Sequence, residues 1–444
     1  MARSWSPYWN PKHETLARDD LQRLQLHKLQ RTVRRAHERS PFHRRLYEEA
    51  GVTPDAIRTL DDIRRLPFMT RANWMECQAA QPLFGDMLTR GIDDAIRYHL
   101  TSGTSGRQPL RVLDSRKDWS WIGEAWCYGF WGFGIRPHDR VFFAFSYGSF
   151  IGFWGAHYCC EKIGCMVLPS GNMTTENRVK QIVEMEATVV CATPTYALRM
   201  GQSAQQMGID VAKDGKVERV IVSGEPAAPP TKRLIEEMWG AKCGDTAGMT
   251  EIGTIMIFEC DHQPGGTHII EDHFIEEVLD PETGEPVGYG ERGERVVTSF
   301  GRGFIPLIRY RTKDMVVKVP HSTCACGRTG DIYEGGILGR VDDMKVIRGT
   351  NVYPRAVEAI VREYAEVEEF QIVLTREDGI RDEITVQCEL SPSARDGWPQ
   401  LSKKLGADLA HAHEGLRFQL ELADVGALPR FELKAKRLQD RREQ

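Results

Sequence analysis

A short segment rich in hydroxyl groups and glycine is the first candidate for chemistry. The run Thr101-Ser102-Gly103-Thr104-Ser105-Gly106 places four hydroxyls and two glycines in six residues. Glycine permits the close approach and positive φ that turn backbone N–H groups and hydroxyls toward phosphate oxygens. No Gly-Lys-Ser/Thr sequence closes the segment, so it is not the phosphate loop of P-loop NTPases. It predicts a phosphate-binding loop of another kind, with a plain surface turn as the alternative.

Thiol and imidazole side chains form the second candidate. The set consists of Cys260, His268, Cys324 and Cys326. Three thiolates and one imidazole match a tetrahedral Cys3His zinc site, and four protein ligands would make it structural because no position stays open for water. The Cys-x-Cys spacing is irregular for zinc, and buried free cysteines are the alternative. His262 could replace His268, and His321 is close enough to compete.

Composition limits the class of protein. A chain of 444 residues and 50.4 kDa is long enough for two or three compact domains, and 41% apolar with 27% charged residues is typical of soluble globular proteins. The formal charge of -5 argues against a nucleic-acid partner. The first residues precede no apolar core, so we expect no secretory signal, a cytoplasmic location and no membrane partner. The 11 cysteines are then expected to be thiols.

The elements that would position these residues follow from the apolar pattern. Residues 14–39 have helical spacing and Pro41 ends it. Buried runs at 141–145, 189–192 and 220–223 end in turn residues, which indicates parallel βα units between about 97 and 335 with ligands at the strand carboxyl ends. The uncharged stretch 141–160 reaches membrane-spanning length, but its glycines favour a strand, a turn and a helix. After Arg340 alternating strands and two helical patterns predict a small α+β domain.

Further segments follow the hydroxyl-rich loop in a fixed order. They are residues 245–251, residues 310–314, residues 339–343 with 348–349, and Lys434. With the loop they resemble the adenylate-forming superfamily of acyl-CoA synthetases, and most closely the phenylacetate-CoA ligase family, over nearly the whole chain. Further similar stretches are 40–42 with Tyr47, 66–68, 192–197, 271–274 and 351–354.

The resemblance implies an α/β fold in two parts. A large N-terminal domain, residues 1–338, would have mixed and parallel sheets flanked by helices and would bind ATP and the acyl group. Residues 339–343 would form a hinge, and residues 344–444 a small, mobile α+β domain. No internal repeat stands out in the sequence.

The resemblance also implies a reaction. An aromatic or arylacetic acid would attack ATP to form an acyl-adenylate and pyrophosphate, and coenzyme A would then take the acyl group and release AMP. Bringing anions together requires donors and a divalent cation where charge develops, so Mg2+ is expected. The alternatives are an enzyme that passes the acyl group to a carrier protein or an amine, and a catalytically lapsed, zinc-containing homologue. A homodimer is one option for the oligomeric state.

The family's ATP-binding residues carry over to matching positions. These are Thr101, Ser102, Gly103, Thr104, Ser105, Gly106, Ser223, Gly224, Glu225, Pro226, Asp245, Thr246, Thr250 and Asp314. The loop would cradle the β and γ phosphates, residues 223–226 would lie along adenine, and Asp314 would accept hydrogen bonds from the ribose hydroxyls. Glu251 would hold Mg2+. Ala247 stands where the family has an aromatic residue, so ring stacking on adenine is lost there.

The remaining roles concern movement between half-reactions. Lys434 would neutralise charge between the carboxylate and the α-phosphate, with Lys436 as its rival. Arg340 would contact phosphate, Asp342 would be the residue on which the small domain turns, and Gly349 would line the pantetheine path. Leu433 replaces the family's usual glycine, which together with Ala247 favours the lapsed homologue.

Aromatic residues mark a candidate acyl pocket. The implied lining consists of Tyr147, Phe150, Gly152 and Tyr196. An ordinary hydrophobic core is the alternative. The family's Phe-Thr-Gly-Gly stretch is Phe150-Ile151-Gly152-Phe153 here, and the added bulk favours an acid other than phenylacetate. Some members of the family carry a zinc ion, which supports the Cys3His site.

Overall fold

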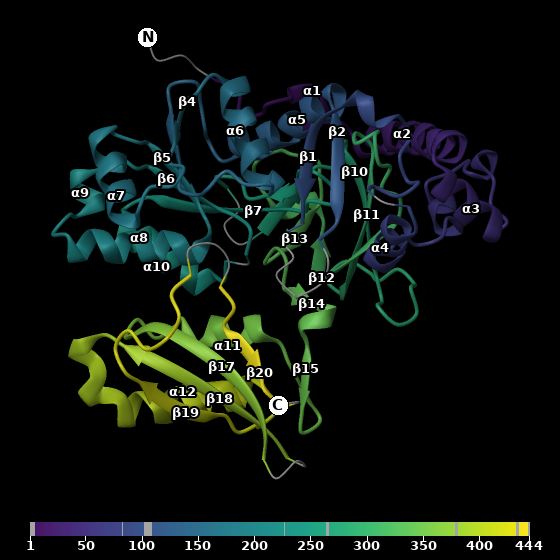
Figure 1. Cartoon of the computed structure of the whole chain (residues 1–444). Helices are drawn as coiled ribbons and strands as arrows, with labels where there is room; N and C mark the ends of the chain where they lie inside the picture. Colours follow the sequence, from purple (N-terminus) through teal and green to yellow (C-terminus); the bar gives the residue numbers. More distant parts are fainter. Residues whose placement is uncertain are drawn as a thin grey trace.

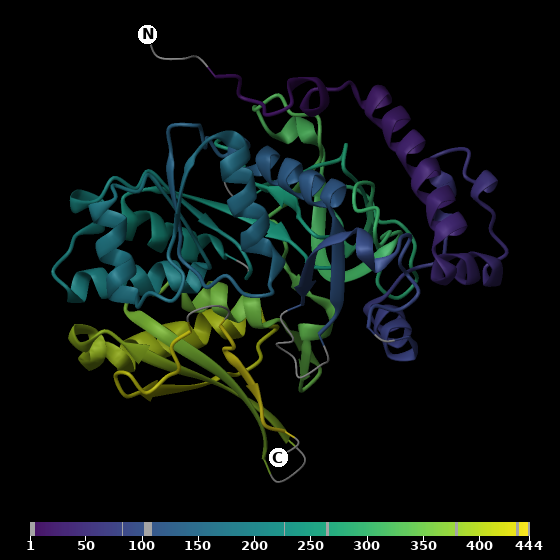
Figure 2. The same cartoon turned by 45° about the horizontal axis from the view of Figure 1, so that its top comes forward.

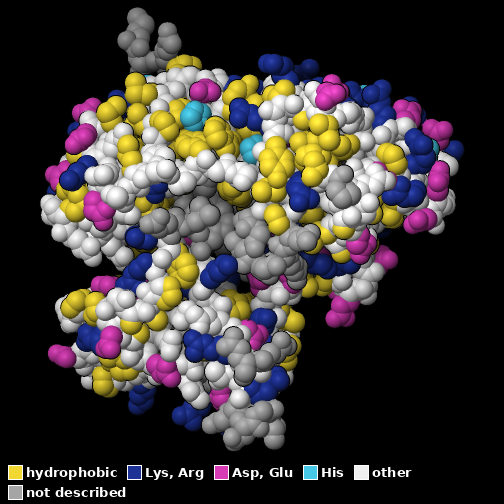
Figure 3. All heavy atoms as spheres, in the orientation of Figure 1, with side chains coloured by type: hydrophobic (Ala, Val, Ile, Leu, Met, Phe, Trp, Pro, Cys, Tyr) yellow, Lys and Arg dark blue, Asp and Glu magenta, His cyan; other side chains and the backbone are white. Residues whose placement is uncertain are grey.

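The computed structural model describes residues 5–81, 83–101, 109–225, 227–262, 266–377, 381–431 and 435–442. A large domain occupies the upper part of Figure 1, and the C-terminal domain lies below it. The space-filling view shows the C-terminal domain as a separate lobe (Figure 3). The connection between them follows β14 (Gly339–Arg340), which still pairs with a strand of the large domain.

The N-terminal part is helical. It comprises α1 (Pro11–Glu14), α2 (Arg18–Arg39), α3 (Pro41–Glu49) and α4 (Arg71–Ala80). The predicted amphipathic helix is α2, which buries Leu21, Leu29 and Val33. Ser40 ends α2 and caps α3, because its hydroxyl accepts from the His43 N–H and Pro41 fits the first helical turn. Figure 2 shows α2 and α3 along one side of the large domain, away from the C-terminal domain.

Five parallel strands form one half of the central sheet. They are β3 (Arg140–Phe143), β4 (Met166–Pro169), β5 (Val189–Ala192), β6 (Arg219–Val222) and β7 (Lys242–Gly248). Alternate residues enter two cores: Phe143 packs with α5 (Arg116–Gly132) and α6 (Ile151–Ile163), and Phe142 packs on the opposite face. The helices of that face are α7 (Thr175–Glu184), α8 (Pro194–Gln206), α9 (Val211–Asp214) and α10 (Pro229–Trp239). The predicted strand-turn-helix over 141–160 is therefore confirmed.

The other half of the sheet is antiparallel. It contains β8 (Ile255–Phe258), β9 (Gly266–Ile269), β10 (Phe274–Leu279), β11 (Arg292–Ser299), β12 (Tyr310–Val319), β13 (Ile332–Glu334) and β14. The prediction of parallel βα units is wrong for residues 255–335, because the described connections of this range (all but 263–265) contain no crossover helix, which parallel pairing requires. A separate antiparallel ribbon joins β1 (Ala95–Leu100) to β2 (Arg111–Ser115).

The C-terminal domain has the predicted α+β pattern. Its elements are the hairpin β15 (Lys345–Ile347) and β16 (Thr350–Val352), then α11 (Pro354–Val361), β17 (Val367–Glu377), β18 (Arg381–Leu390), α12 (Trp398–Ala412), β19 (Gln419–Ala423) and β20 (Leu438–Asp440). The strands are ordered β19-β18-β17-β20 around a core of their own.

Short 3-10 turns connect the regular elements. They are η1 (Pro54–Ala56), η2 (Asp61–Arg65), η3 (Ile92–Asp94), η4 (His321–Thr323), η5 (Val341–Asp343) and η6 (Pro392–Gly397). Within the described ranges, no helix combines the length and the apolar character needed to cross a bilayer.

Candidate active site and metal centre

The carboxyl ends of β6 and β7 bring two predicted nucleotide-binding segments together. Parallel pairing sets Val222 beside Asp245, and the Ser223 hydroxyl donates to the Thr246 carbonyl at 3.0 Å. Gly224 has φ +91°, a left-handed conformation that favours glycine and lets the chain leave the strand sharply. Ligands of open α/β sheets gather at such strand ends. The structure therefore unites residues 223–225 with 245–246, while Pro226 lies outside the described residues.

A cavity of about 270 Å³ opens beside this strand end. Its wall includes Asp245, Lys232, Glu259, Thr267, Gly335 and Gly336. Burial, followed by the charge of Glu259, raises the pKa of Asp245 to about 7, although Lys232 opposes this. The Thr267 hydroxyl is buried and has no hydrogen-bond partner among the described residues. A buried hydroxyl without a partner at the wall of a cavity of this size favours a polar ligand.

A buried arginine holds the turn that carries Glu251. Arg302 donates to both carboxylate oxygens of Asp114, at 2.7 and 2.8 Å. Its Nη1 also donates to the carbonyls of Thr250 at 2.7 Å and Glu251 at 2.9 Å. A bidentate pair of this kind fixes orientation as well as charge. The backbone of Glu251, a buried residue, is thereby held in place after β7.

Arg71 is a site residue that sequence reasoning missed. Its Nη1 donates to Glu251 Oε1 at 2.9 Å, and its Nη2 donates to the Thr101 hydroxyl at 3.3 Å. The Tyr310 hydroxyl lies 3.5 Å from the same Glu251 oxygen. Arg71 begins α4 and stands just after the similar stretch 66–68, which was its only signal. The Arg71 guanidinium therefore links Glu251, the predicted Mg2+ ligand, to Thr101, the first residue of the predicted phosphate loop.

Three predicted groups lie outside the described residues. They are Ser102, Gly103, Thr104, Ser105 and Gly106 of the loop, Pro226, and Lys434. Thr101 is described: its N–H donates to the Leu110 carbonyl at 3.1 Å, and its hydroxyl accepts from the Leu110 N–H at 2.9 Å. The two ends of the loop are therefore held at one point beside Arg71.

Asp314 and Arg340 meet through strand pairing. They are partners in the β12–β14 ladder, and Arg340 Nη1 donates to Asp314 Oδ1 at 3.3 Å. The β11–β12 register shifts near this point, and Lys313 has φ +67°, which identifies a bulge. Asp314 is 6% exposed, and burial raises its pKa to about 6 despite Arg340 and Arg295.

The raised pKa of Asp314 predicts a pH effect on nucleotide binding. Only the carboxylate can accept from both ribose hydroxyls, so we expect the affinity for ATP to fall up to about tenfold per pH unit below pH 6. An Asp314→Asn variant should bind ATP weakly with no such dependence. Titration calorimetry from pH 5 to 8 measures both, and Asp245→Asn removes the second titration near pH 7. Identical pH profiles for the wild type and Asp314→Asn would refute the ribose role.

Aromatic side chains gather after β3, where the acyl pocket is predicted. The Tyr147 hydroxyl lies 2.8 Å from His157 Nδ1, and the Tyr147 and Trp154 rings are 4.9 Å apart. A Cβ on Gly152 would lie 2.8 Å from the Phe150 ring, so glycine is required for that ring to lie against α6. Tyr147 therefore lies against α6 at Trp154 and His157, and Phe150 lies against the first turn of the same helix at Gly152.

The structure does not support the prediction that Tyr196 lines the acyl pocket. It is 1% exposed and belongs to the core on the opposite face of the sheet, with Phe142 rather than Phe143. Its hydroxyl accepts from Arg178 Nη1 at 2.7 Å and contacts Thr175 at 3.1 Å. Because α8 packs on that face, the structure removes Tyr196 from the predicted pocket.

The predicted hinge residue lies on the connection between the domains, and the predicted pantetheine residue lies in the first hairpin of the C-terminal domain. Asp342 in η5 pairs with Arg340 at 2.9 Å and is exposed. Gly349, in the turn of the β15–β16 hairpin, is exposed and has φ +88°, and a Cβ there would meet open space. Lys436, the rival to Lys434, is exposed. In this domain arrangement Gly349 is on the surface, so its predicted role would require the small domain to turn.

The four predicted metal ligands meet in one buried cluster. Their ligand atoms all lie within 4.8 Å of one another. Cys260 Sγ is 3.7 Å from Cys324 Sγ and 3.4 Å from His268 Nε2, which is also 3.4 Å from Cys326 Sγ. With Zn–S near 2.3 Å and Zn–N near 2.0 Å, a tetrahedron has edges of about 3.8 Å and 3.5 Å. The donor set and its geometry therefore fit zinc, and His262, which is exposed, is not part of the cluster.

Electrostatics within the cluster also suit a cation. Burial alone would lower the pKa of His268, but the Cys324 and Cys326 sulfurs outweigh burial and raise it to about 9. Hydrogen bonding from Cys260 holds the pKa of Cys326 well below its ordinary value. Thiolates close to one another and to an imidazole form a negative site that a divalent metal stabilises.

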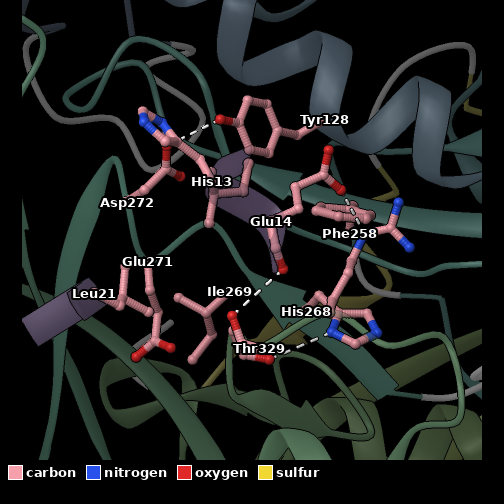
Figure 4. Close-up of a pocket in the computed structure, with 13 residues that line it drawn as sticks. His13, Glu14, Leu21, Tyr128, Phe258, His268, Ile269, Glu271, Asp272 and Thr329 are labelled. Atoms are coloured by element: carbon pink, nitrogen blue, oxygen red, sulfur yellow. Dashed lines mark hydrogen bonds and ion pairs between the residues drawn. The ribbon is translucent and has the colours of Figure 1, made fainter. Parts of the chain in front are cut away.

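The N-terminal segment, residues 6–18, is fastened over the metal cluster. The Tyr8 hydroxyl donates to the Cys326 carbonyl at 2.9 Å, and Arg328 Nε donates to Glu14 Oε2 at 2.6 Å. Figure 4 shows Glu14 beside Thr329, whose N–H donates to the Glu14 carbonyl at 3.0 Å. The segment therefore closes the side of the cluster that residues 326–329 form.

Asp272 fastens the same segment on its other side. His13 Nδ1 lies 3.0 Å and the Tyr128 hydroxyl 2.9 Å from Asp272 Oδ2, and both side chains converge on it in Figure 4. Burial opposes ionisation of Asp272, but His273, His13 and Lys28 prevail and hold its pKa well below the usual range. An ionised carboxylate thus links the segment to α5.

Comparison with known proteins matches this arrangement. The AMP-binding enzyme family matches residues 54–301, and the AMP-binding enzyme C-terminal domain matches residues 349–442. Phenylacetate-coenzyme A ligase of Thermus thermophilus is 35% identical over 86% of this chain and 84% of its own. That of Aromatoleum evansii is 32% identical over 97% and 96%.

The chain belongs to the phenylacetate-CoA ligase family of the adenylate-forming superfamily. The findings support ATP-dependent acyl-CoA ligation through an acyl-AMP intermediate. Among solved structures, 2-hydroxyisobutyryl-CoA ligase in its postadenylation state has a TM-score of 0.93 at 30% identity, over 100% of this chain and 94% of its own.

The same 2-hydroxyisobutyryl-CoA ligase also indicates which domain arrangement is present. Its open conformation gives a TM-score of 0.76 over 99% of this chain, and its thioesterification state gives 0.74 over 99%. The postadenylation state gives 0.93 over the whole chain, so the arrangement of the chain is more similar to that structure than to the other two.

Proposed function

We propose that this chain ligates an aromatic or arylacetic acid to coenzyme A. The observation that carries the substrate class is the set of aromatic side chains after β3, where Tyr147 lies against Trp154 and Phe150 lies against Gly152, because flat rings can pack against an aromatic acid. The names of the curated relatives support an arylacetic acid. The isoleucine and phenylalanine that follow Phe150 and Gly152 favour an acid other than phenylacetate itself.

The chemistry follows from position and charge. A carboxylate oxygen attacks the α-phosphorus of ATP, the bond to the β-phosphate breaks, and pyrophosphate leaves. The thiolate of coenzyme A then attacks the acyl carbon and AMP leaves, so no covalent enzyme intermediate is needed. Arg71 and Thr101 would bind the triphosphate, and Asp314 would bind the ribose. Arg340, which donates to Asp314, would also contact a phosphate.

Two metal ions complete the proposal. Mg2+ would be held by Glu251, whose buried carboxylate is the hard oxygen ligand that this ion prefers, and it would neutralise phosphate charge. Zn2+ would be held by Cys260, His268, Cys324 and Cys326 and would stabilise the fold. Arg71 contacts the same Glu251 oxygen, so we expect it to move toward phosphate when Mg2+ binds.

A panel of acids tests the substrate proposal. Pyrophosphate release would be measured with phenylacetate, benzoate, substituted aryl acids and 2-hydroxyisobutyrate, each with and without coenzyme A. We expect an aryl acid to give kcat/KM at least tenfold above 2-hydroxyisobutyrate, because burial of a ring in an apolar pocket adds more than about 1.4 kcal/mol. The product should be a CoA thioester by mass spectrometry.

Each other outcome of the panel contradicts a defined part of the proposal. Acyl-adenylate that accumulates with coenzyme A present indicates a carrier protein or amine as acceptor. A preference for 2-hydroxyisobutyrate contradicts the aryl pocket. No pyrophosphate with any acid, from a folded protein that binds ATP, supports the lapsed homologue.

A further inference from the structure

Arg295 is buried in the central sheet and uses only part of its guanidinium group. The side chain is 0% exposed, and its Nε and Nη2 donate to the two carboxylate oxygens of Glu276 on β10. The Tyr333 hydroxyl donates to the same carboxylate at 2.8 Å. The remaining nitrogen, Nη1, is also buried and has no hydrogen-bond partner among the described residues. Native proteins seldom leave a buried donor in this condition, because it costs free energy.

Nη1 of Arg295 faces the carboxylate that is predicted to bind ribose. It lies 3.9 Å from Asp314 Oδ2, and a shift of about 1 Å would bring the two atoms to hydrogen-bonding distance. Arg340 Nη1 contacts the other oxygen, Oδ1, at 3.3 Å. The Asp314 carboxylate therefore stands between two guanidinium groups. An ionised carboxylate has about four acceptor positions, so two such contacts still leave two positions for the ribose hydroxyls.

A bulge between β11 and β12 explains how Arg295 comes to face Asp314. The register of the two strands shifts between residues 294 and 296, so that Arg295 alone stands opposite residues 312–314. The Thr312 hydroxyl donates to the Arg295 carbonyl at 2.8 Å and accepts from the Asp314 N–H at 3.0 Å. Bulges re-aim side chains beside active sites. The main chain and the side chain of Arg295 thus both act on the segment that carries the carboxylate.

Resting on the proposed function, in which Asp314 binds ribose, we propose that Arg295 is a positioning residue that holds the Asp314 carboxylate in place for the ribose hydroxyls of ATP. When the nucleotide binds, Nη1 closes on Oδ2 and gains a hydrogen-bond partner. Arg340 lies in the predicted hinge, residues 339–343, whereas Arg295 is fixed inside the sheet by Glu276. Arg295 is therefore the contact of Asp314 that does not depend on the position of the small domain.

The charges around Asp314 support this role. Burial raises the pKa of Asp314, and the charge of Glu251 adds to this, whereas Arg340 and then Arg295 lower it. Arg295 is thus one of two positive charges that favour the ionised form. Only the ionised carboxylate can accept from both ribose hydroxyls, so orientation and charge act in the same direction.

Selectivity for the ribose 2′-hydroxyl tests the role of Arg295. Calorimetry on the full chain would compare the binding of ATP and 2′-deoxy-ATP with Mg2+ and without any acid. We expect the wild type to bind ATP at least about tenfold more tightly, because 2′-deoxy-ATP lacks a hydrogen bond to a charged acceptor. Arg295→Met combined with Glu276→Gln should lower this ratio to less than about threefold. Both members of the ion pair are replaced so that no charge stays unpaired in the sheet.

Glu276→Gln alone is the matched control, because it removes the same buried ion pair but keeps the guanidinium group. We expect the ratio to stay within about twofold of the wild-type ratio. Arg295→Lys is a second variant that keeps the charge and the pair with Glu276. A lysine has no second planar arm to reach Asp314, so the ratio should again fall to less than about threefold. The kcat of pyrophosphate release at saturating ATP should change less than about threefold in each variant.

A wild-type ratio in both Arg295 variants would overturn the proposal. An equal loss of affinity for the two nucleotides, with the ratio unchanged, would overturn it as well and would indicate a purely structural role. A wild type that binds both nucleotides equally would remove the ribose role of Asp314 and with it the role of Arg295. Absence of pyrophosphate release with every acid would instead refute the proposed function, while nucleotide binding would still report on Arg295.

Discussion

Replacing Lys434 with alanine is expected to lower acid-dependent pyrophosphate release about 10³-fold. The lysine would place a positive charge where the carboxylate meets the α-phosphate, and removing one such group from a site costs about 10²–10³ in kcat. The conversion of supplied acyl-adenylate with coenzyme A should remain within a few-fold, because the charge that the lysine would neutralise develops in adenylate formation. Pyrophosphate release and thioester formation, measured separately, check the two halves.

Lys436→Ala is the matched control for this experiment. Lys436 is exposed, lies two residues away and carries the same charge. We expect its loss to change either half-reaction by less than threefold. A large defect in Lys436→Ala with a small one in Lys434→Ala would exchange the two assignments.

Serine in place of Cys326 is expected to give the largest effect on stability. The variant should lose its zinc, which atomic emission would measure as a fall from one equivalent per chain. Removing a metal from a buried cluster costs about 4 kcal/mol or more, and at about 2 °C per kcal/mol for a large domain the melting temperature should fall by roughly 8 °C. Calorimetry measures the shift.

Cys77→Ser controls for the loss of a thiol. Cys77 and Cys326 have the same exposure, 8%, and the Cys77 sulfur donates to Asp86 Oδ1 at 3.1 Å, a bond that a hydroxyl can replace. Its melting temperature should fall by no more than about 3 °C. Wild-type protein that contains no zinc after purification and gains no stability from added zinc would contradict the proposed metal centre.

The sequence predicted the parallel half of the sheet better than the antiparallel half. Runs such as residues 189–192 are apolar throughout because both faces are buried, and a continuous apolar run is a strong signal. By contrast, β10 and β11 contain Glu276 and Arg295, which look like surface residues in a sequence. The structure buries both as an ion pair inside the sheet. A charge that finds its partner only after folding breaks the pattern on which strand prediction relies.

The residues of the candidate site could also be predicted only in part. Motif order identified Glu251 and Asp314, and strand pairing then brought Asp314 to Arg340. Arg71 could not be found this way, because it comes 180 residues before its partner Glu251 and no local pattern links them. The prediction that Tyr196 lines the acyl pocket was wrong for a different reason. Its position beside a motif was clear from the sequence, but the face of the sheet on which α8 packs was not.

The attachment of the N-terminal segment bears on how the chain is made. Tyr8 and Glu14 find their partners at Cys326 and Arg328, separated by 318 and 314 positions. A ribosome that adds roughly 5–20 residues per second needs about 16 to 64 seconds to supply those partners. Until then the segment can contact only partners that are made earlier, such as Glu124, which accepts from Trp9 Nε1 at 2.7 Å. The contacts of Tyr8 and Glu14 with Cys326 and Arg328 can therefore form only late in translation, after most of the large domain has been synthesised.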